Sequence, residues 1–86
     1  MERVVARYRG KLIPTGSTQH VVAGAAVEKF DELQVIQLGE RAYSLIYLLG
    51  SRELTDTFHE SATAAFDQAE FEFGVRSDQW EVVGKN

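Results

Sequence analysis

Hydrophobic and polar residues alternate with a period of two over much of the chain, which is typical of strands buried on one face. In the first such segment Val4, Ala6 and Tyr8 alternate with residues that give it a basic outer face, and Gly10 ends it. Three further strands are predicted downstream, and they include the clearest patterns in the chain. They cover residues 33–38, 42–49 and 54–59.

The predicted strand 42–49 is hydrophobic on both faces, because Leu45 and Tyr47 alternate with Ile46 and Leu48. A strand of this kind belongs in the interior of a sheet. One helix cannot cover both faces of a sheet, so the pattern predicts that the second face meets something else.

One long helix is predicted from about residue 61 to residue 73. Ser61 is a good N-cap because its hydroxyl can accept a hydrogen bond from the first turn, and Gly74 can adopt the left-handed conformation that ends a helix. The hydrophobic residues between them recur at helical spacing and form one stripe that must face the sheet. The stripe consists of Ala62, Ala65, Phe66, Ala69 and Phe73.

Phe71 lies on the opposite side of this helix, among acidic residues that include Glu72 and are expected to form a solvated face. Two main explanations are open, and a single exposed phenylalanine without a role is the third. Either the segment after the helix folds back and covers Phe71, or Phe71 belongs to an exposed contact site with a charged rim. The residues of that predicted contact site are Phe71, Trp80, Asp67 and Glu70.

Three other segments allow alternatives. Residues 20–30 fit a strand better than a helix, because valine favours strands and Gly24 is costly inside a helix. Thr57 and Glu60 match a capping box that would start the helix earlier. Residues 81–83 are either a last strand or a docked end.

Composition fits one small globular domain. The 86 residues are 44% hydrophobic and 26% charged, and we expect a single domain over residues 1–86. The predicted fold is α+β, an antiparallel β-meander of four to five strands with one C-terminal helix packed on one face. The chain shows no run that could span a bilayer and no signal peptide, so we expect no membrane partner and a cytoplasmic location. The absence of cysteine excludes disulfides and thiolate metal sites.

Charge is distributed unevenly along the chain. Residues 1–30 carry a net charge of +3 and residues 31–86 a net charge of −7, which gives the overall −4. The simplest interpretation is internal pairing between a basic first strand and an acidic helix. The competing hypothesis is nucleic-acid binding, which requires clustered cations. Its candidate residues are Arg3, Arg7, Arg9 and Lys11.

His59 and Glu60 are the remaining candidates for acid-base or metal chemistry. Adjacent residues of a strand point to opposite faces, so these two side chains cannot readily share one site. No phosphate-binding loop and no G-x-S-x-G motif occurs in the chain. We therefore expect no catalytic residues, no metal and no cofactor, and an enzyme or metal protein centred on His59 is the third hypothesis.

The C-terminal half contains T-D-T-F-H-E-S at residues 55–61, then Q-A-E-F-E-F-G-V at residues 68–75, and Trp80. This pattern resembles short bacterial proteins of unknown function that share such a signature. The resemblance implies a β-meander followed by one helix, and it implies no particular activity.

These patterns favour a non-catalytic domain that binds another protein or forms a homodimer. The predicted surface is either the contact site around Phe71 or the sheet face opposite the helix.

Overall fold

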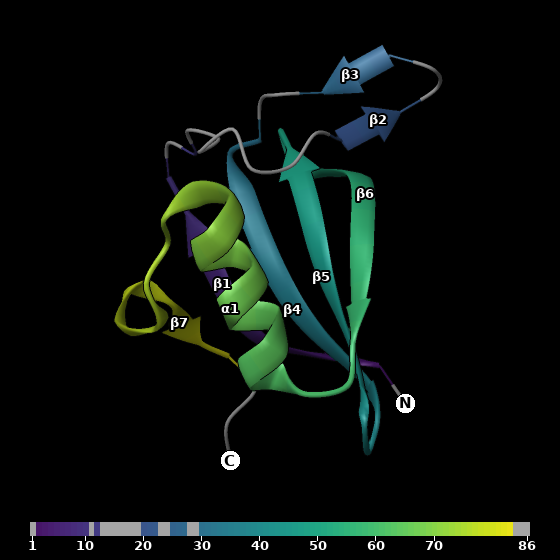
Figure 1. The fold of residues 1–86 in the computed structure, drawn as a ribbon, viewed down its shortest axis with the longest axis vertical. Helices are drawn as coiled ribbons and strands as arrows, with labels where there is room; N and C mark the ends of the chain where they lie inside the picture. The colour runs from purple at the N-terminus through teal and green to yellow at the C-terminus, as the bar shows by residue number, and fades with distance from the viewer. Residues whose placement is uncertain (1, 11, 13–19, 23–24, 28–29, 84–86) are drawn as a thin grey trace.

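The computed structural model describes residues 2–10, 12, 20–22, 25–27 and 30–83. Its elements, in chain order, are β1 (Arg3–Arg9), β2 (His20–Val22), β3 (Ala25–Val27), β4 (Glu32–Gly39), β5 (Ala42–Leu49), β6 (Arg52–His59), α1 (Ala62–Phe73), η1 (Ser77–Gln79) and β7 (Glu81–Val82). Five strands form one antiparallel sheet in the order β6-β5-β4-β1-β7, and α1 lies across one face of it (Figure 1). The predicted α+β meander with one helix is confirmed.

The strand β5 lies between β4 and β6, as its two hydrophobic faces predicted. On the face that meets α1, Leu45 and Tyr47 are fully buried together with Leu33 and Val35 of β4. On the other face Ile46 and Leu48 are also buried, although α1 does not reach them. The alternation of side chains along β5 therefore supplies both the main core and the base of a second surface.

The helix α1 begins and ends where the sequence predicted. The Ser61 hydroxyl accepts a hydrogen bond from the backbone N–H of Ala64 at 3.0 Å, and Gly74 adopts the left-handed conformation with φ of 70°. Ala65 and Ala69 are fully buried against the sheet, because their small side chains let the helix backbone approach the strands closely. The alternative capping box at Thr57 is wrong, since residues up to His59 belong to β6.

The first strand contains an irregularity that the sequence did not predict. Val4 pairs with Ile36 whereas Ala6 pairs with Val35, so Val5 is an extra residue of the β-bulge kind. The bulge reverses the alternation, and Arg3 consequently lies on the same face as α1 while Arg7 and Arg9 lie on the other face. The prediction of one basic face along this strand is therefore wrong for Arg3.

Residues 20–30 do not form one strand of the main sheet. The strands β2 and β3 pair with each other as a separate two-stranded sheet, which lies beyond one end of the large sheet (Figure 1). Extended structure was predicted for this segment, and the helical alternative is wrong for the two described strands. Residues 23–24 and 28–29 lie outside the described part of the chain.

The segment after α1 folds back onto the sheet through the short η1 turn. Trp80 is only 8% exposed and its ring lies 5.0 Å from Phe66 and 6.4 Å from Tyr8, measured between ring centroids. The chain then pairs with β1 as β7, so of the two alternatives for this segment the last strand is the one confirmed. This segment covers the Phe66 side of the helix and leaves Phe71 56% exposed, so the prediction that it buries Phe71 is wrong.

Candidate functional site

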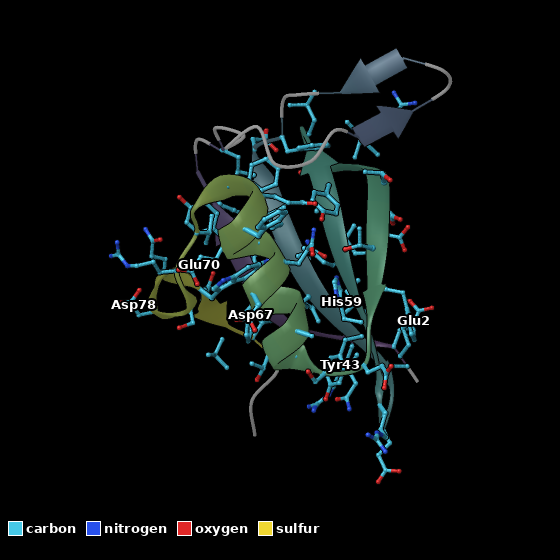
Figure 2. The ribbon with its side chains drawn as sticks, in the orientation of Figure 1. Glu2, Tyr43, His59, Asp67, Glu70 and Asp78 are labelled. Atoms are coloured by element: carbon cyan, nitrogen blue, oxygen red, sulfur yellow. The ribbon has the colours of Figure 1, made fainter. Side chains whose placement is uncertain are left out.

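The predicted contact site on the outer side of α1 is only partly present. Phe71, Asp67 and Glu70 are exposed on the helix, and Figure 2 shows the two acidic side chains on α1. Trp80 belongs to the core and does not join them. The sequence could not show this, because the position of Trp80 depends on the η1 turn.

His59 lies at the end of β6, opposite Tyr43 of β5, and Figure 2 shows both close to the start of α1. Its Nε2 is 2.8 Å from the Thr57 hydroxyl. Burial lowers the pKa of His59 below its usual value, and the negative charge of Glu72 opposes this shift. Glu60 is exposed beyond the strand, so the two neighbours form no shared site.

The described residues contain no group of three or more metal-ligating side chains that could hold a metal ion. Among the described residues, the candidate that remains for the hypothesis of an enzyme centre is His59 with its hydrogen-bonded neighbours.

A polar network that the sequence did not predict lies between α1 and the sheet. Glu72 was expected on the solvated face of the helix, but its residue is only 2% exposed. The Tyr47 hydroxyl donates to one carboxylate oxygen of Glu72 at 2.6 Å, and the Gln68 side-chain amide donates to the other at 2.6 Å. The expectation of a solvated Glu72 is wrong because these donors replace the water that a buried carboxylate loses.

This network extends toward His59. The Tyr47 hydroxyl also lies 3.4 Å from the Thr57 hydroxyl, which contacts the imidazole. Burial, and next the hydrogen bond to Glu72, raises the pKa of the Tyr47 hydroxyl well above its usual range. A phenol held in its neutral form by a buried carboxylate is a stable structural donor, and the network connects β5, β6 and α1 by defined hydrogen bonds.

The arginines proposed for nucleic-acid binding each have a partner within the chain. Both Nε and Nη2 of Arg3 donate to the Gln37 side-chain oxygen, at 3.2 and 3.0 Å. Arg7 forms an ion pair with Glu81 at 3.5 Å. Arg9 forms one with Glu32, also at 3.5 Å.

These contacts bear directly on phosphate binding. The bulge separates Arg3 from the other two arginines, and acidic neighbours offset the charge that would attract a phosphate. Lys11 lies outside the described residues.

The sheet face opposite α1, called the outer face below, carries two exposed hydrophobic side chains, Phe58 and Leu38. Phe58 of β6 is 64% exposed, and Leu38 of β4 is 38% exposed. Beside them is a groove of about 270 Å³ whose hydrophobic base includes Ile36 and Ile46. The residues that line the groove are Glu2, Ile36, Leu38, Ser44, Ile46, Glu53 and Asp56.

Acidic side chains form the rim of this groove. Asp56 is held by a hydrogen bond from the Ser44 hydroxyl at 2.9 Å, which fixes a carboxylate above the hydrophobic base. Glu53 stands on the same strand, and Glu2 approaches from the segment before β1, at the opposite end of the sheet from β2 and β3 (Figure 2). The sequence contained evidence for this surface in the two hydrophobic faces of residues 42–49, but not for the exposure of Phe58.

No protein-family model, curated protein or solved structure matches this chain. Among the described residues, no helix is long and apolar enough to cross a membrane.

Proposed function

We propose that this protein is a non-catalytic interaction domain that binds a protein partner through its outer face. The observation that carries the proposal is Phe58, which is 64% exposed on a strand, next to a hydrophobic groove with an acidic rim. Protein interfaces commonly combine an aromatic anchor with a polar rim, because burial of the ring supplies free energy and the charges select the partner.

The other candidate sites have weaker support. The buried carboxylate of Glu72 already accepts hydrogen bonds from Tyr47 and Gln68. The described N-terminal arginines are engaged with neighbouring side chains. The exposed hydrophobic surface of the outer face, next to its groove, has no such role within the domain.

The chain offers a matched pair of variants to test this proposal. Phe58→Glu and Phe71→Glu each place a negative charge at an exposed phenylalanine, one on the outer face and the other on the helix. Both variants are expected to keep the fold, which circular dichroism would verify.

The readout is any protein association, whether with a second copy or with another protein. Light scattering of the purified protein after size exclusion measures the first, and affinity capture from a cell extract measures the second. We expect Phe58→Glu to lose the association of the wild type and Phe71→Glu to retain it. The opposite pattern, or equal behaviour of the two variants, would contradict the proposal.

A further inference from the structure

We propose that the groove of the outer face receives a basic segment of a protein partner, whose lysine or arginine side chain lies along the hydrophobic base and reaches the acidic rim. This inference rests on the proposed function and names the chemistry of the partner. It follows from the unbalanced charge of the rim, from a rim carboxylate that is held in place, and from the hydrophobic base beneath both.

The negative charge of the groove is not balanced within the described part of the chain. Arg7 and Arg9 lie on the same face, but they already pair with Glu81 and Glu32. Three carboxylates and no cationic side chain line the groove, and no ion pair joins any of them to a described residue. Like charges across an interface are costly, so the rim favours a cationic partner. The three residues are Glu2, Glu53 and Asp56, all of them exposed.

One of these carboxylates is oriented by a buried serine. Ser44 of β5 is only 3% exposed, and its hydroxyl donates to Oδ2 of Asp56 at 2.9 Å. The other carboxylate oxygen, Oδ1, has no hydrogen bond among the described residues. A side chain that is already fixed loses little conformational freedom when it accepts a further hydrogen bond. Asp56 is therefore prepared to accept a hydrogen bond from an ammonium or guanidinium group.

The base of the groove favours a cation that carries a hydrocarbon stem. Ile36 and Ile46 line the base, and the exposed ring of Phe58 lies on the same face two residues after Asp56. Lysine and arginine bury their methylene stems on apolar surface while the charged head reaches polar groups. Either head can also lie over an aromatic ring. One basic side chain therefore meets the base, the rim and the neighbouring ring.

The size of the groove fits a side chain of a larger partner. Its volume of about 270 Å³ is slightly below the roughly 300 to 1,000 Å³ of pockets that enclose small-molecule ligands. A groove of this size takes one or two side chains of a protein segment, and the exposed surface beside it supports the rest of that segment.

The strand register defines the pattern of the partner segment. Glu53, Asp56 and Phe58 occupy successive outer-face positions of β6, because the irregularity after Glu53 keeps that residue on this face. Successive side chains on one face of an extended chain are about 6.7 Å apart. An extended segment that carries two basic residues and then a hydrophobic one, at alternate positions, matches this series.

The first test uses a peptide of this pattern. The probe is a fluorescein-labelled pentapeptide with arginine at its first and third positions, leucine at its last position and serine between them. The matched control peptide has glutamate in place of both arginines. We expect only the basic peptide to bind the full chain in fluorescence anisotropy, and its dissociation constant should rise with added salt, which screens exposed charges. Equal binding of the two peptides would overturn the proposal.

Neutralisation of the rim locates the binding. Glu2→Gln combined with Glu53→Gln and Asp56→Asn removes three charges, and the asparagine oxygen can still accept from Ser44. The dissociation constant of the basic peptide should rise about tenfold, because three exposed ion pairs together correspond to about that factor. Circular dichroism verifies the fold of the variant.

The control variant removes three exposed carboxylates from α1 and η1, shown in Figure 2, and should keep the wild-type dissociation constant. Its substitutions are Asp67→Asn, Glu70→Gln and Asp78→Asn. Equal weakening in the two variants would overturn the groove as the site, because net charge alone would then explain the attraction.

Absence of binding at the highest soluble concentration of the basic peptide would overturn the basic segment as the occupant. In that case, a homodimer of wild type that is lost in Phe58→Glu would still uphold the proposed function, with a second copy as the partner. Failure of the two proposals can therefore be distinguished.

Discussion

Replacement of Tyr47 by phenylalanine tests whether the buried polar network stabilises the fold. The change removes only the hydroxyl, which donates to Glu72 at 2.6 Å, and it keeps the ring in contact with Phe30 at 5.3 Å and Phe73 at 6.1 Å between centroids. The carboxylate retains the hydrogen bond from Gln68. Any loss of stability therefore reports the hydroxyl and not the packing.

The size of the effect follows from the burial of both partners. A hydrogen bond to a charged group contributes about 1.5 to 3 kcal/mol to stability. Tyr47 is fully buried and Glu72 is 2% exposed, so we expect Tyr47→Phe to cost about 1.5 to 3 kcal/mol. A small domain has a total stability of about 5 to 15 kcal/mol, which makes this a large fraction.

The assay is urea unfolding followed by the fluorescence of Trp80, the one tryptophan of the chain, which is buried in the core. For a slope of about 1 kcal/mol per molar urea, the midpoint should fall by about 1.5 M or more. Tyr43→Phe is the matched control, because Tyr43 lies on the same strand and face but its hydroxyl has no hydrogen bond among the described residues. An equal loss in both variants, or no loss in Tyr47→Phe, would refute the role assigned to the network.

Three further predictions concern the helix and His59. Phe66→Ala should lower the free energy of unfolding by about 2 to 4 kcal/mol, because the Phe66 ring packs on Trp80. Phe71→Ala, at an exposed position, should lower it by less than about 1 kcal/mol. Equal losses of the two variants in urea unfolding would contradict this packing. Ser61→Ala should cost about 1 kcal/mol through loss of the N-cap hydrogen bond, and Ser61→Asp should retain most of it. The lowered pKa of His59 means that its contribution to stability is complete above about pH 6.5 and is lost as the pH falls through the lower folded value. When the pH falls from about 7 to about 5, His59→Gln should therefore lose less stability than wild type. Equal losses of stability in the variant and in wild type over this range would argue against this.

Much of the fold follows from local patterns in the sequence. The strand residues 42–49 and the helix with its caps at Ser61 and Gly74 were predicted because hydrophobic spacing and capping chemistry act over a few residues. Glu72 was placed wrongly although its position contained a clue. At 100° per residue it lies only about 20° from the direction of Ala65, near the edge of the buried stripe.

The remaining errors have causes that a single sequence does not contain. Burial of Glu72 depends on the Tyr47 hydroxyl of a distant strand, and burial of Trp80 depends on the path of the η1 turn. The β-bulge at Val5 reverses the faces of Arg3 and Arg7, but a bulge leaves no fixed residue pattern. For the outer face, the sequence predicted an uncovered hydrophobic surface, and the strand register supplied the arrangement of its charges.

The position of β1 has a consequence for how the chain folds during synthesis. Both neighbours of this strand, β4 and β7, lie far downstream of it in the sequence. The hairpins of β4, β5 and β6 can form locally, whereas β1 must wait for β4, and its second edge must wait until residue 82 has emerged. We expect the nascent chain to expose β1 as an open strand edge until β4 and β7 have emerged, which makes this segment a natural place for chaperone contact and for aggregation.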